Sequence, residues 1–464
     1  MKKTICNELK RHLASLNLLG IAPPKKISQR PYNSFSVALI TLLILSATQV
    51  LANLQVMLGY VDMREAKIWT GDDSQGEITC SYFITGQKSP AVIMEYTLSP
   101  ENLLCHTFIA GPLEPGTSYT CQVSNTRGES IQFYFTTQTH WQYRMDAPDF
   151  SFAAGSCVFV SDEAYDRPGK SYGGEYEIFT QITKQQPQFM LWLGDNVYLR
   201  ETETSAMSGI TYRYRHTRNQ PEIKQLLTAF PHMAIWDDHD YGPNNGDASY
   251  YHKNLSGEAF RRFWANPGYG IEGASSTCIT SMFSWSDADF FLLDNRSHRT
   301  PPELKGLNAP TILGEVQITW LIQALKNSKA TFKFIAMGGQ FLNTHNYSET
   351  YSTYPQERQR IIDLIDQNGI KGVVFLTGDR HCGELSKITT SAGIDIYDLT
   401  VSPLTSASYN LTSEPNHLRL EGTVVPHRHF ATLTVTGKKG QRQLTIKTIL
   451  SDGSVKYEKN IPQP

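Results

Sequence analysis

Residues 236–247 have the sequence WDDHDYGPNNGD and directly follow the apolar residues PHMAI. The apolar residues predict a short buried strand, so the acids would lie just past its end. Adjacent carboxylates repel one another, and a cluster of them is tolerated where water solvates it or where cations neutralise it. We therefore expect at least one of the acids in WDDHD to bind a cation.

Five other segments share this arrangement of an apolar strand that ends in polar residues. They are FSFAAGSC (150–157), FMLWLGDNVY (189–198), DFFLLDNRSHR (289–299), FKFIAMGGQFLN (332–343) and GVVFLTGDRHCGE (372–384). Helical patterns intervene at 315–328 and 354–369, and residues 429–460 predict antiparallel strands. The chain from about 150 to 460 is therefore expected to form a layered α/β domain, with its polar residues at the strand ends where ligands commonly bind.

Residues 53–143 have a different pattern, in which short runs of alternating apolar and polar residues are separated by turn residues. This pattern predicts an all-β sandwich. Within it, LEPGTSY (113–119) resembles the tyrosine corner of fibronectin type III domains, where a tyrosine hydroxyl bonds back to the backbone. Cys80, Cys105 and Cys121 lie close together in this region, which allows one disulfide whose pairing the sequence does not determine.

The first 52 residues predict an export segment. A basic stretch (1–34) precedes the uncharged apolar residues FSVALITLLILSA (35–47), and VLA (50–52) offers small residues for cleavage. These are the parts of a signal peptide, with an uncleaved N-terminal membrane anchor as the alternative. The apolar run is short for a membrane-spanning helix. Either way, we expect the rest of the chain to be exported, as a periplasmic, secreted or membrane-anchored protein.

The overall charge of the chain bears on its partners. The 464 residues carry a net charge of −2, and 19% of them are charged. The chain therefore has no global positive field to attract nucleic acid, and nucleic-acid binding is not expected. The oligomeric state is not determined by the sequence.

Taken together, GSC, LGDNVY, WDDHDYGPNN, LLDNRSHR and LTGDRH resemble the motifs of calcineurin-like metallophosphoesterases, and specifically those of the alkaline phosphatase D (PhoD-type) family. The resemblance extends from residue 53 to about residue 450. It implies an α/β fold, a metallophosphoesterase αββα sandwich (150–460) preceded by a fibronectin type III-like β-sandwich (53–143). It also implies an alkaline phosphatase, a phosphomonoesterase or phosphodiesterase that depends on bound metals.

The resemblance assigns metal ligands residue by residue. Asp195 takes the place of a carboxylate that bridges two metals. Cys157 and Tyr198 take the places of ligands to the first metal, and Asp238 takes the place of a ligand to the second. Asp379 is a further implied ligand, and we expect it to share the first metal with Cys157, Tyr198 and Asp195.

The resemblance also implies a catalytic set of Asp195, His239 and His381. His239 takes the place of a histidine near the leaving group, and His381 lies beside the site. One position departs from the family pattern, because Gln340 stands in the region where relatives place a metal-binding histidine. An amide oxygen is a poorer ligand than imidazole, so this departure leaves the ligands of the second metal incompletely assigned.

The donor types themselves favour particular metals. Phenolate and carboxylate suit a hard trivalent ion, so Fe³⁺ fits better than zinc, and a position built from oxygens suits calcium, magnesium or manganese. We therefore expect a binuclear site with Fe³⁺ and Ca²⁺, and Mg, Mn and Zn are the alternatives. Two cations about 3.5–4 Å apart clamp a phosphoryl group and activate a hydroxide.

Several of these residues have structural alternatives. Cys157 is also compatible with a buried apolar position or with half of a disulfide, and Tyr198 with packing under a loop. Asp237 is compatible with capping the following turn or with reaching a metal through a neighbour. Asp240 and the PNN that follows it predict a turn, with contact of Asn244 or Asn245 to the second metal as the alternative.

Four residues are expected to bind substrate, namely Asn245, Arg296, Arg299 and Arg380. The arginines are suited to bidentate contacts with phosphate, and structural ion pairs are their alternative role. His427 and His429 have the spacing of metal ligands but no acidic companion, so we expect them to be structural.

These observations predict a metal-dependent hydrolase that acts on a small phosphate ester or a phospholipid. A phospholipase D-like phosphodiesterase is the alternative among enzymes, because it needs the same metal clamp and a wider pocket. A non-catalytic surface-binding protein that uses the β-sandwich for adhesion is the alternative from another class, and the intact metal motifs argue against it. Loops such as residues 201–220 are expected to set the width of the pocket.

Overall fold

The structure is a computed structural model that describes residues 54–87, 91–304, 309–346 and 349–464. The predicted export segment (1–52) lies outside these residues. Asn53–Pro464 forms one compact unit. Among the helices of the described ranges, none combines the length and the apolar character needed to cross a membrane.

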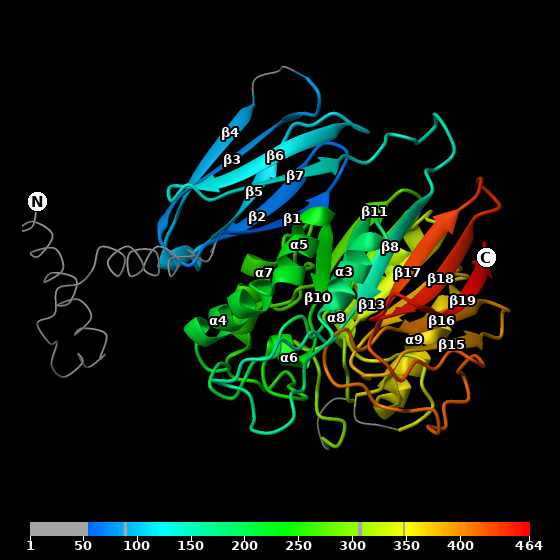
Figure 1. Cartoon of the computed structure of the whole chain (residues 1–464). Coiled ribbons are helices and arrows are strands. Elements are labelled where there is room, and N and C mark those ends of the chain that lie inside the picture. Colours follow the sequence, from blue (N-terminus) through cyan, green and yellow to red (C-terminus); the bar gives the residue numbers. More distant parts are fainter. Residues whose placement is uncertain (1–53, 88–90, 305–308, 347–348) are drawn as a thin grey trace, which may run out of the picture. The chain divides into compact units, whose positions relative to one another are not determined.

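The first seven strands form a β-sandwich (Figure 1). One sheet has the order β1 (Gln55–Val61), β2 (Ala66–Gly71), β5 (Cys105–Ala110). The other has the order β4 (Val92–Leu98), β3 (Gly76–Ile84), β6 (Ser118–Asn125), β7 (Ser130–Thr136). All neighbouring strands are antiparallel, and a short helix, η1 (Pro100–Asn102), precedes β5. The predicted all-β sandwich is confirmed.

The interior of the β-sandwich contains the tyrosine corner expected from the sequence. The hydroxyl of Tyr119 accepts a hydrogen bond from the backbone N–H of Glu114 at 2.8 Å. The sulfurs of Cys80 and Cys121 lie 3.7 Å apart in the same interior, whereas Cys105 belongs to the other sheet. All three cysteines are free thiols in this structure, so the disulfide that the sequence allowed is not formed here.

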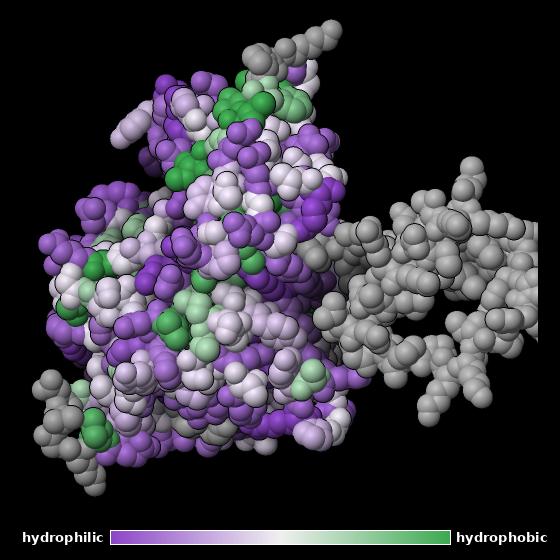
Figure 2. Space-filling view, turned by 90° about the vertical axis from the view of Figure 1, so that its left-hand side faces the viewer, coloured by the Kyte–Doolittle hydropathy of each residue, from purple (hydrophilic) through white to green (hydrophobic). Residues whose placement is uncertain are grey.

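The surface of the β-sandwich carries an apolar area at an edge strand. Val92 and Ile93 of β4, which is an edge strand, are exposed by 48% and 63%. Figure 2 shows hydrophobic side chains in small groups on a largely hydrophilic surface.

Residues from Phe150 onward form two six-stranded sheets. The first has the order β10 (His232–Ile235), β9 (Phe189–Leu193), β8 (Phe150–Gly155), β17 (His429–Thr436), β18 (Gln443–Leu450), β19 (Val455–Pro462). The second has the order β11 (Ser281–Trp285), β12 (Ala288–Leu292), β13 (Phe332–Met337), β14 (Val373–Thr377), β16 (Asp395–Thr400), β15 (Glu384–Thr389). Strands β8, β9 and β10 are parallel, as are β12, β13, β14 and β16. The C-terminal strands are antiparallel, as predicted.

The two sheets pack face to face through aromatic side chains. The ring of Phe152 on β8 lies 5.0–5.2 Å, between centroids, from those of Phe189, Phe290 and Phe334. A strand that is covered on both faces has no polar side to present, and β9 and β14 accordingly consist of buried residues throughout. The layered arrangement fixes where the strand ends lie.

Helices cover the outer face of each sheet (Figure 1). Residues of α3 (Glu177–Lys184), α5 (Pro221–Ala229) and α7 (Lys253–Phe263) share a core with the first sheet. Residues of α8 (Gly314–Asn327) and α9 (Pro355–Gln367) share a core with the second. Two short helices, α6 (Asp238–Tyr241) and η2 (Tyr351–Thr353), lie in loops. This is the predicted αββα sandwich.

One expectation about the loops was wrong. Residues 201–220, expected to be a loop, contain the helix α4 (Met207–Arg218). Ile210 and Tyr214 are one helical turn apart and both are buried. The same helix also buries Arg213 and Arg218. Because charged residues occupy part of its buried face, the apolar periodicity that identifies a helix is weak in this segment.

The β-sandwich packs against α7 and the residues that follow it. The indole N–H of Trp69 on β2 donates to the backbone oxygen of Arg262 at 2.8 Å. The ring of Trp69 packs on Phe263, and the guanidinium of Arg218 lies 4.1 Å from its centroid. Lys67 donates to the backbone oxygen of Asn266 at 2.8 Å. Polar and apolar contacts therefore join the two folds along one face.

Candidate metal centre

The polar residues of the sequence motifs meet at the carboxyl ends of the parallel strands. Cys157 follows β8, Asp195 follows β9, Asp238 follows β10 and Asp379 follows β14. The first three strands belong to one sheet and β14 belongs to the other. Because the sheets are stacked, their carboxyl ends bring residues from distant parts of the chain into one place.

The backbone at these positions has an unusual conformation. Cys157, Asp195, Asp379 and His381 have φ angles of 62°, 51°, 66° and 52°. Residues other than glycine rarely adopt this left-handed region, which costs on the order of 1 kcal/mol or more for each residue. The surrounding strands hold the three loops that carry these residues in this conformation.

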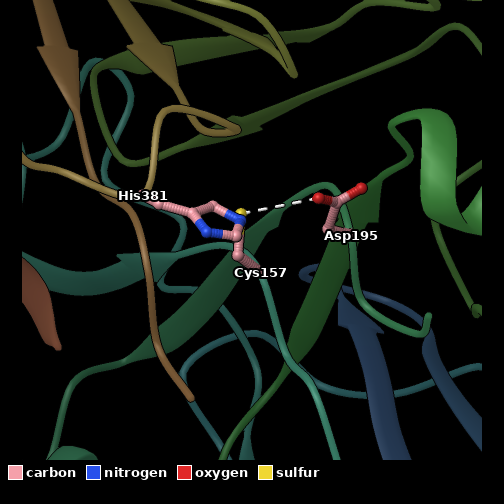
Figure 3. Close-up of side chains that lie close together, drawn as sticks. All are labelled: Cys157, Asp195 and His381. Carbon is pink, nitrogen blue, oxygen red and sulfur yellow. Dashed lines mark hydrogen bonds between the residues drawn. The ribbon is translucent and has the colours of Figure 1, made fainter. Parts of the chain in front are cut away.

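The first of three potential ligand groups combines Cys157, Asp195 and His381 (Figure 3). One ligand atom of each lies within 4.8 Å of the other two. The Cys157 thiol donates to Asp195 Oδ2 at 3.5 Å, and the Tyr198 hydroxyl donates to the same oxygen at 3.1 Å. The Tyr198 oxygen also lies 3.1 Å from His381 Nε2. A thiol, a phenol, a carboxylate and an imidazole therefore converge on one small volume.

Two further groups share members with the first. Asp195, Asp238 and His239 form the second group, and Asp237, Asp238 and Asp379 form the third. Asp195 and Asp238 each belong to two groups, so each presents its carboxylate to two adjoining positions. This arrangement is suited to two neighbouring cations that share a carboxylate.

The grouping divides the residues differently from the expectation. Asp379 was expected to share a metal with Cys157, whereas the structure places His381 with Cys157 and places Asp379 with Asp237 and Asp238. Asp237, whose role the sequence left open, is fully buried. Asp237 Oδ2 and Asp238 Oδ1 are buried and have no hydrogen-bond partner among the described residues. Such buried oxygens require compensation, and a cation supplies it.

The electrostatics of the cluster also fit bound cations. Burial and the nearby carboxylates of Asp238 and Asp237 raise the pKa of Asp195 well above its ordinary value. Burial and neighbouring acids likewise raise the pKa of Asp379. Burial and the Asp195 charge raise the pKa of the Cys157 thiol and that of Tyr198. Nearby positive charge reverses such shifts, and metal ions bind thiolate, phenolate and carboxylate in their anionic forms. The residues present therefore fit two cations.

Comparison with known proteins gives this cluster a context. The sequence profile of the PhoD-like phosphatases matches residues 152–448. The chain belongs to the PhoD-like phosphatase family. It is 26% identical over 289 residues to alkaline phosphatase D of Bacillus subtilis (strain 168), across 52% of this chain and 48% of that protein. The chain therefore matches about half the length of this curated relative.

Solved structures share the fold of this PhoD-like phosphatase. The structure of PhoD superimposes with a TM-score of 0.72 at 17% identity, covering 88% of this chain and 90% of that one. The purple acid phosphatase PPD1 from yellow lupin (Lupinus luteus) seeds superimposes with a TM-score of 0.61 at 12% identity, covering 88% and 74%. Both matches include the β-sandwich as well as the αββα domain, because each covers far more than the 152–448 region.

A buried arginine contacts the acids of the cluster. Arg296 forms ion pairs with Asp237 and with Glu349, the latter at 2.8 Å, and its guanidinium lies 3.6 Å from Asp238. Its side chain is fully buried. Arg296 was expected to bind phosphate, with structural ion pairs as the alternative, and the structure shows it in ion pairs. Glu349 was not anticipated, because it lies in the polar segment ETYSTY with no apolar strand before it.

The other two arginines are likewise buried and paired. Arg299 contacts Glu349 at 3.2 Å, and Arg380 forms an ion pair with Glu414. Both arginines are less than a tenth exposed. In the PhoD-like fold their position beside the acids compensates part of the negative charge of the site.

Asn245 and Gln340 occupy different surroundings. Asn245 is exposed, has a φ of 58°, and donates its backbone N–H to Asp238 Oδ2 at 2.6 Å. Gln340 is fully buried, donates to Glu384 at 2.5 Å and accepts from Asn343 at 2.7 Å. Asn245 therefore fixes the orientation of one acid through its backbone, while the Gln340 amide is engaged by protein neighbours.

Asp240 has a role that the sequence did not indicate. It was expected to belong to a turn, but it is fully buried and accepts hydrogen bonds from the backbone N–H of Asp237 and of Asn196, each at 3.1 Å. The side chain of Asn196 donates to it at 3.0 Å. Burial raises the pKa of Asp240 to about 8. Asp240 therefore joins the loop after β9 to the loop after β10.

Two serines complete the surroundings of His381. Ser402 donates to Cys157 Sγ at 3.1 Å and accepts from the backbone N–H of His381 at 2.8 Å, while Ser406 Oγ lies 3.3 Å from His381 Nε2. Burial, together with the nearby His239, lowers the pKa of His381 to about 4. The imidazole is therefore neutral near pH 7 and offers a nitrogen lone pair.

The histidines at the C-terminal strand lie apart from the metal centre. His429 is buried, and its Nδ1 lies 2.7 Å from the backbone oxygen of His427. Burial lowers the pKa of His429 to about 4. Neither histidine belongs to a ligand group within the described part of the chain.

Proposed function

We propose that this protein hydrolyses phosphate esters at a centre of two adjacent metal ions. The observation that supports this most directly is the sharing of Asp195 and Asp238 among three adjoining ligand groups. A shared carboxylate holds two cations at the spacing that clamps a phosphoryl group. Membership in the PhoD-like phosphatases supports the same class of reaction.

The residues around the metals have separate roles in this proposal. When bound, the metals supply Lewis acidity and a nucleophile that exists at neutral pH. Asp195 and Asp238 set the spacing between the two metals, and Cys157 and Tyr198 hold the first metal. The side chain of His239 is 21% exposed, and its ring stacks on Tyr198 with centroids 4.1 Å apart. In this proposal the partly exposed imidazole of His239 donates a proton to the departing alcohol oxygen.

We infer that the first metal, held by Cys157 and Tyr198, is Fe³⁺ and that the second metal, held by Asp238, is Ca²⁺. Mg, Mn and Zn are the alternatives. The first position combines thiol, phenol and carboxylate donors, and the third ligand group consists of carboxylates alone. Hard oxygen donors suit calcium, magnesium or manganese, and phenolate suits ferric iron. Elemental analysis tests this assignment, together with a visible charge-transfer band. Zinc alone in a colourless protein would overturn the iron assignment and leave the two-metal site in place.

We infer that the substrate is a small phosphate ester or a phospholipid encountered outside the cytoplasm. The basic and apolar pattern of residues 1–52 supports export or anchorage at a membrane. Cell fractionation tests this location, because an exported chain would be absent from the cytoplasmic fraction.

The central experiment compares metal-loaded and chelator-treated protein on three substrates. These are a phosphate monoester, a phosphate diester and phospholipid vesicles, assayed side by side with Asp238→Asn as the test variant. Asp452→Asn serves as the control, because this aspartate lies in the turn between β18 and β19, outside the ligand groups. We expect turnover by the loaded wild-type and control proteins only. A protein that holds two metals and turns over none of the three would instead be a binding protein.

A further inference from the structure

A row of aromatic rings leads away from the candidate metal centre. Tyr198 stacks on His239 with centroids 4.1 Å apart. The ring of Tyr172 lies 6.2 Å from that of Tyr198 and 5.8 Å from that of His381. The ring of Tyr409 stacks on that of His381, with centroids 5.2 Å apart and an angle of 15° between the ring planes. Tyr172 and Tyr409 are therefore each one ring away from His381, a member of the first ligand group.

Hydrogen bonds fix the two outer tyrosines in place. The hydroxyl of Tyr172 lies 3.1 Å from His381 Nδ1 and 3.4 Å from the hydroxyl of Tyr409. The backbone N–H of Tyr409 donates to the backbone oxygen of His381 at 2.8 Å. The segment that carries Tyr409 is also joined to the site by the ion pair between Arg380 and Glu414. Tyr409 is therefore held in a defined position although it lies in a long segment without regular structure.

The outer ring is open to solvent. Tyr409 is 49% exposed, while His381, on which it stacks, is 7% exposed. An aromatic ring held rigidly, with one face packed and much of its surface open, binds another planar ring at little entropic cost. His239 and Asp379 are the partly exposed members of the ligand groups. A substrate therefore reaches the metal centre from the side of these two residues.

We propose that Tyr409, supported by Tyr172 and His381, binds a planar ring in the alcohol part of the phosphate ester. The substrate class is thereby narrowed to esters whose alcohol carries an aryl or heteroaryl group. This inference rests on the proposed hydrolysis, in which the oxygen of water forms a bond to phosphorus, the ester P–O bond breaks and the alcohol leaves with a proton. Tyr409 touches the ring of the alcohol and takes no part in the proton transfer.

Two monoesters with alcohols of similar acidity isolate the effect of the ring. Benzyl phosphate carries a planar ring and cyclohexylmethyl phosphate carries a saturated ring of similar size, so leaving-group chemistry is nearly matched. The methyl diesters of the same alcohols extend the comparison to a diesterase. With the metal-loaded enzyme, we expect kcat/KM to favour the benzyl esters by about three- to tenfold, chiefly through KM, as stacked aromatic pairs typically provide.

Three variants show whether this preference comes from Tyr409. Tyr409→Leu should remove most of the preference, and Tyr409→Phe, which keeps the ring, should retain it. Tyr134→Leu is the matched control, because Tyr134 is 57% exposed on β7 of the β-sandwich, and it should leave the preference unchanged. The preference of the wild-type enzyme needs no variant, so equal kcat/KM for the two esters would overturn the inference even if Tyr409→Leu failed to fold.

The outcomes separate this inference from the proposed function. Hydrolysis of both esters by the wild type with equal kcat/KM would overturn the role of Tyr409 and leave the phosphatase activity established. A preference that survives in Tyr409→Leu would do the same. Hydrolysis of neither ester by enzyme with both metals bound would overturn this inference, and failure on phospholipid vesicles as well would overturn the proposed function.

Discussion

The β-sandwich and the metal centre belong to one compact unit, yet they bury different kinds of groups. The interior of the β-sandwich is largely apolar, and Tyr119 satisfies its hydroxyl within a local corner. The metal centre buries Asp195, Asp237, Asp238 and a charged arginine, Arg296. Of these residues Asp195 has a left-handed backbone, as do Cys157, Asp379 and His381 beside it. The first region is held by apolar packing and local hydrogen bonds. The second concentrates repulsion and strain, which the surrounding sheets, the buried Arg296 and, in our proposal, bound cations offset.

The largest expected effect comes from removing the shared carboxylate. Asp195→Asn keeps the shape but removes the negative charge that offsets two cations, so we expect kcat/KM to fall on the order of 10³-fold or more, on monoesters and diesters alike. The second, oxygen-rich position should lose its metal first. The metal-free variant should be at least as stable as metal-free wild type, because one source of repulsion is gone. Metal content, rates on both ester types and thermal unfolding measure these effects.

Full occupancy of both metals in Asp195→Asn, or a loss confined to one ester type, would show that Asp195 shapes the site without bridging. A metal-free variant that is clearly less stable than wild type would show that the metal centre is stabilised by its own contacts. Either result would break the comparison between the two regions.

His239 should affect turnover without affecting the metals. Proton donation to a leaving group is typically worth roughly 10²–10⁴-fold. We expect His239→Ala to retain both metals and to lose about this much rate on esters with poor leaving groups, and less on activated aryl esters. Kinetics on a series of leaving groups, with metal analysis of the same samples, measure the effect. Loss of metal from this variant would make His239 a ligand.

The third prediction concerns the pH dependence of stability in metal-free protein. Burial raises the pKa of Asp240 from 3.8 to about 8, so folded protein binds a proton that unfolded protein releases in this window. The free energy of unfolding should therefore fall as pH rises from about 4 to 8, by up to about 1 kcal/mol per pH unit for this group. The free energy of unfolding of Asp240→Asn should rise relative to that of wild type as pH increases across the same window. Parallel stability curves, measured by denaturant unfolding, would contradict the shift.

The smallest effect is expected in the β-sandwich, and it should be confined to stability. Tyr119→Phe removes one hydrogen bond of the tyrosine corner, which should cost about 0.5–1.5 kcal/mol in the free energy of unfolding. kcat/KM and metal content should be those of wild type. A parallel drop in activity would show that the β-sandwich positions the metal centre and would weaken the contrast between the two regions.

The sequence predicted the parts of the fold that depend on local patterns. Alternating residues marked the β-sandwich, and apolar runs ending in GSC, LGD and TGDRH marked the strands whose ends carry Cys157, Asp195 and Asp379. A buried strand has to be apolar and its polar continuation has to leave the sheet, so both are visible in the order of residues. The same pattern predicted a layered α/β domain, and the αββα architecture was implied by the resemblance of the motifs to those of metallophosphoesterases.

The neighbours of those residues could not be predicted in the same way. Ser402 contacts Cys157 across 245 positions of sequence, and Glu349 and Tyr409 come from segments with no apolar strand before them. Their placement depends on how the two sheets stack, which no local pattern records. The buried role of Asp240 was not predicted for a related reason. Its partner Asn196 lies in another loop, 44 positions away in sequence, so the local pattern is that of an ordinary turn residue.

The contacts of Trp69 with the αββα domain affect whether the β-sandwich can be removed or exchanged in evolution. Its indole lies between Arg218 and Phe263 and is held by the backbone of Arg262. A shortened chain that began after the β-sandwich would leave an aromatic side chain and a buried cation on α7 and α4 facing water. Recombination that exchanged the β-sandwich for another module would have to replace this face at the same time, so inheritance should keep the two folds together as one evolutionary unit.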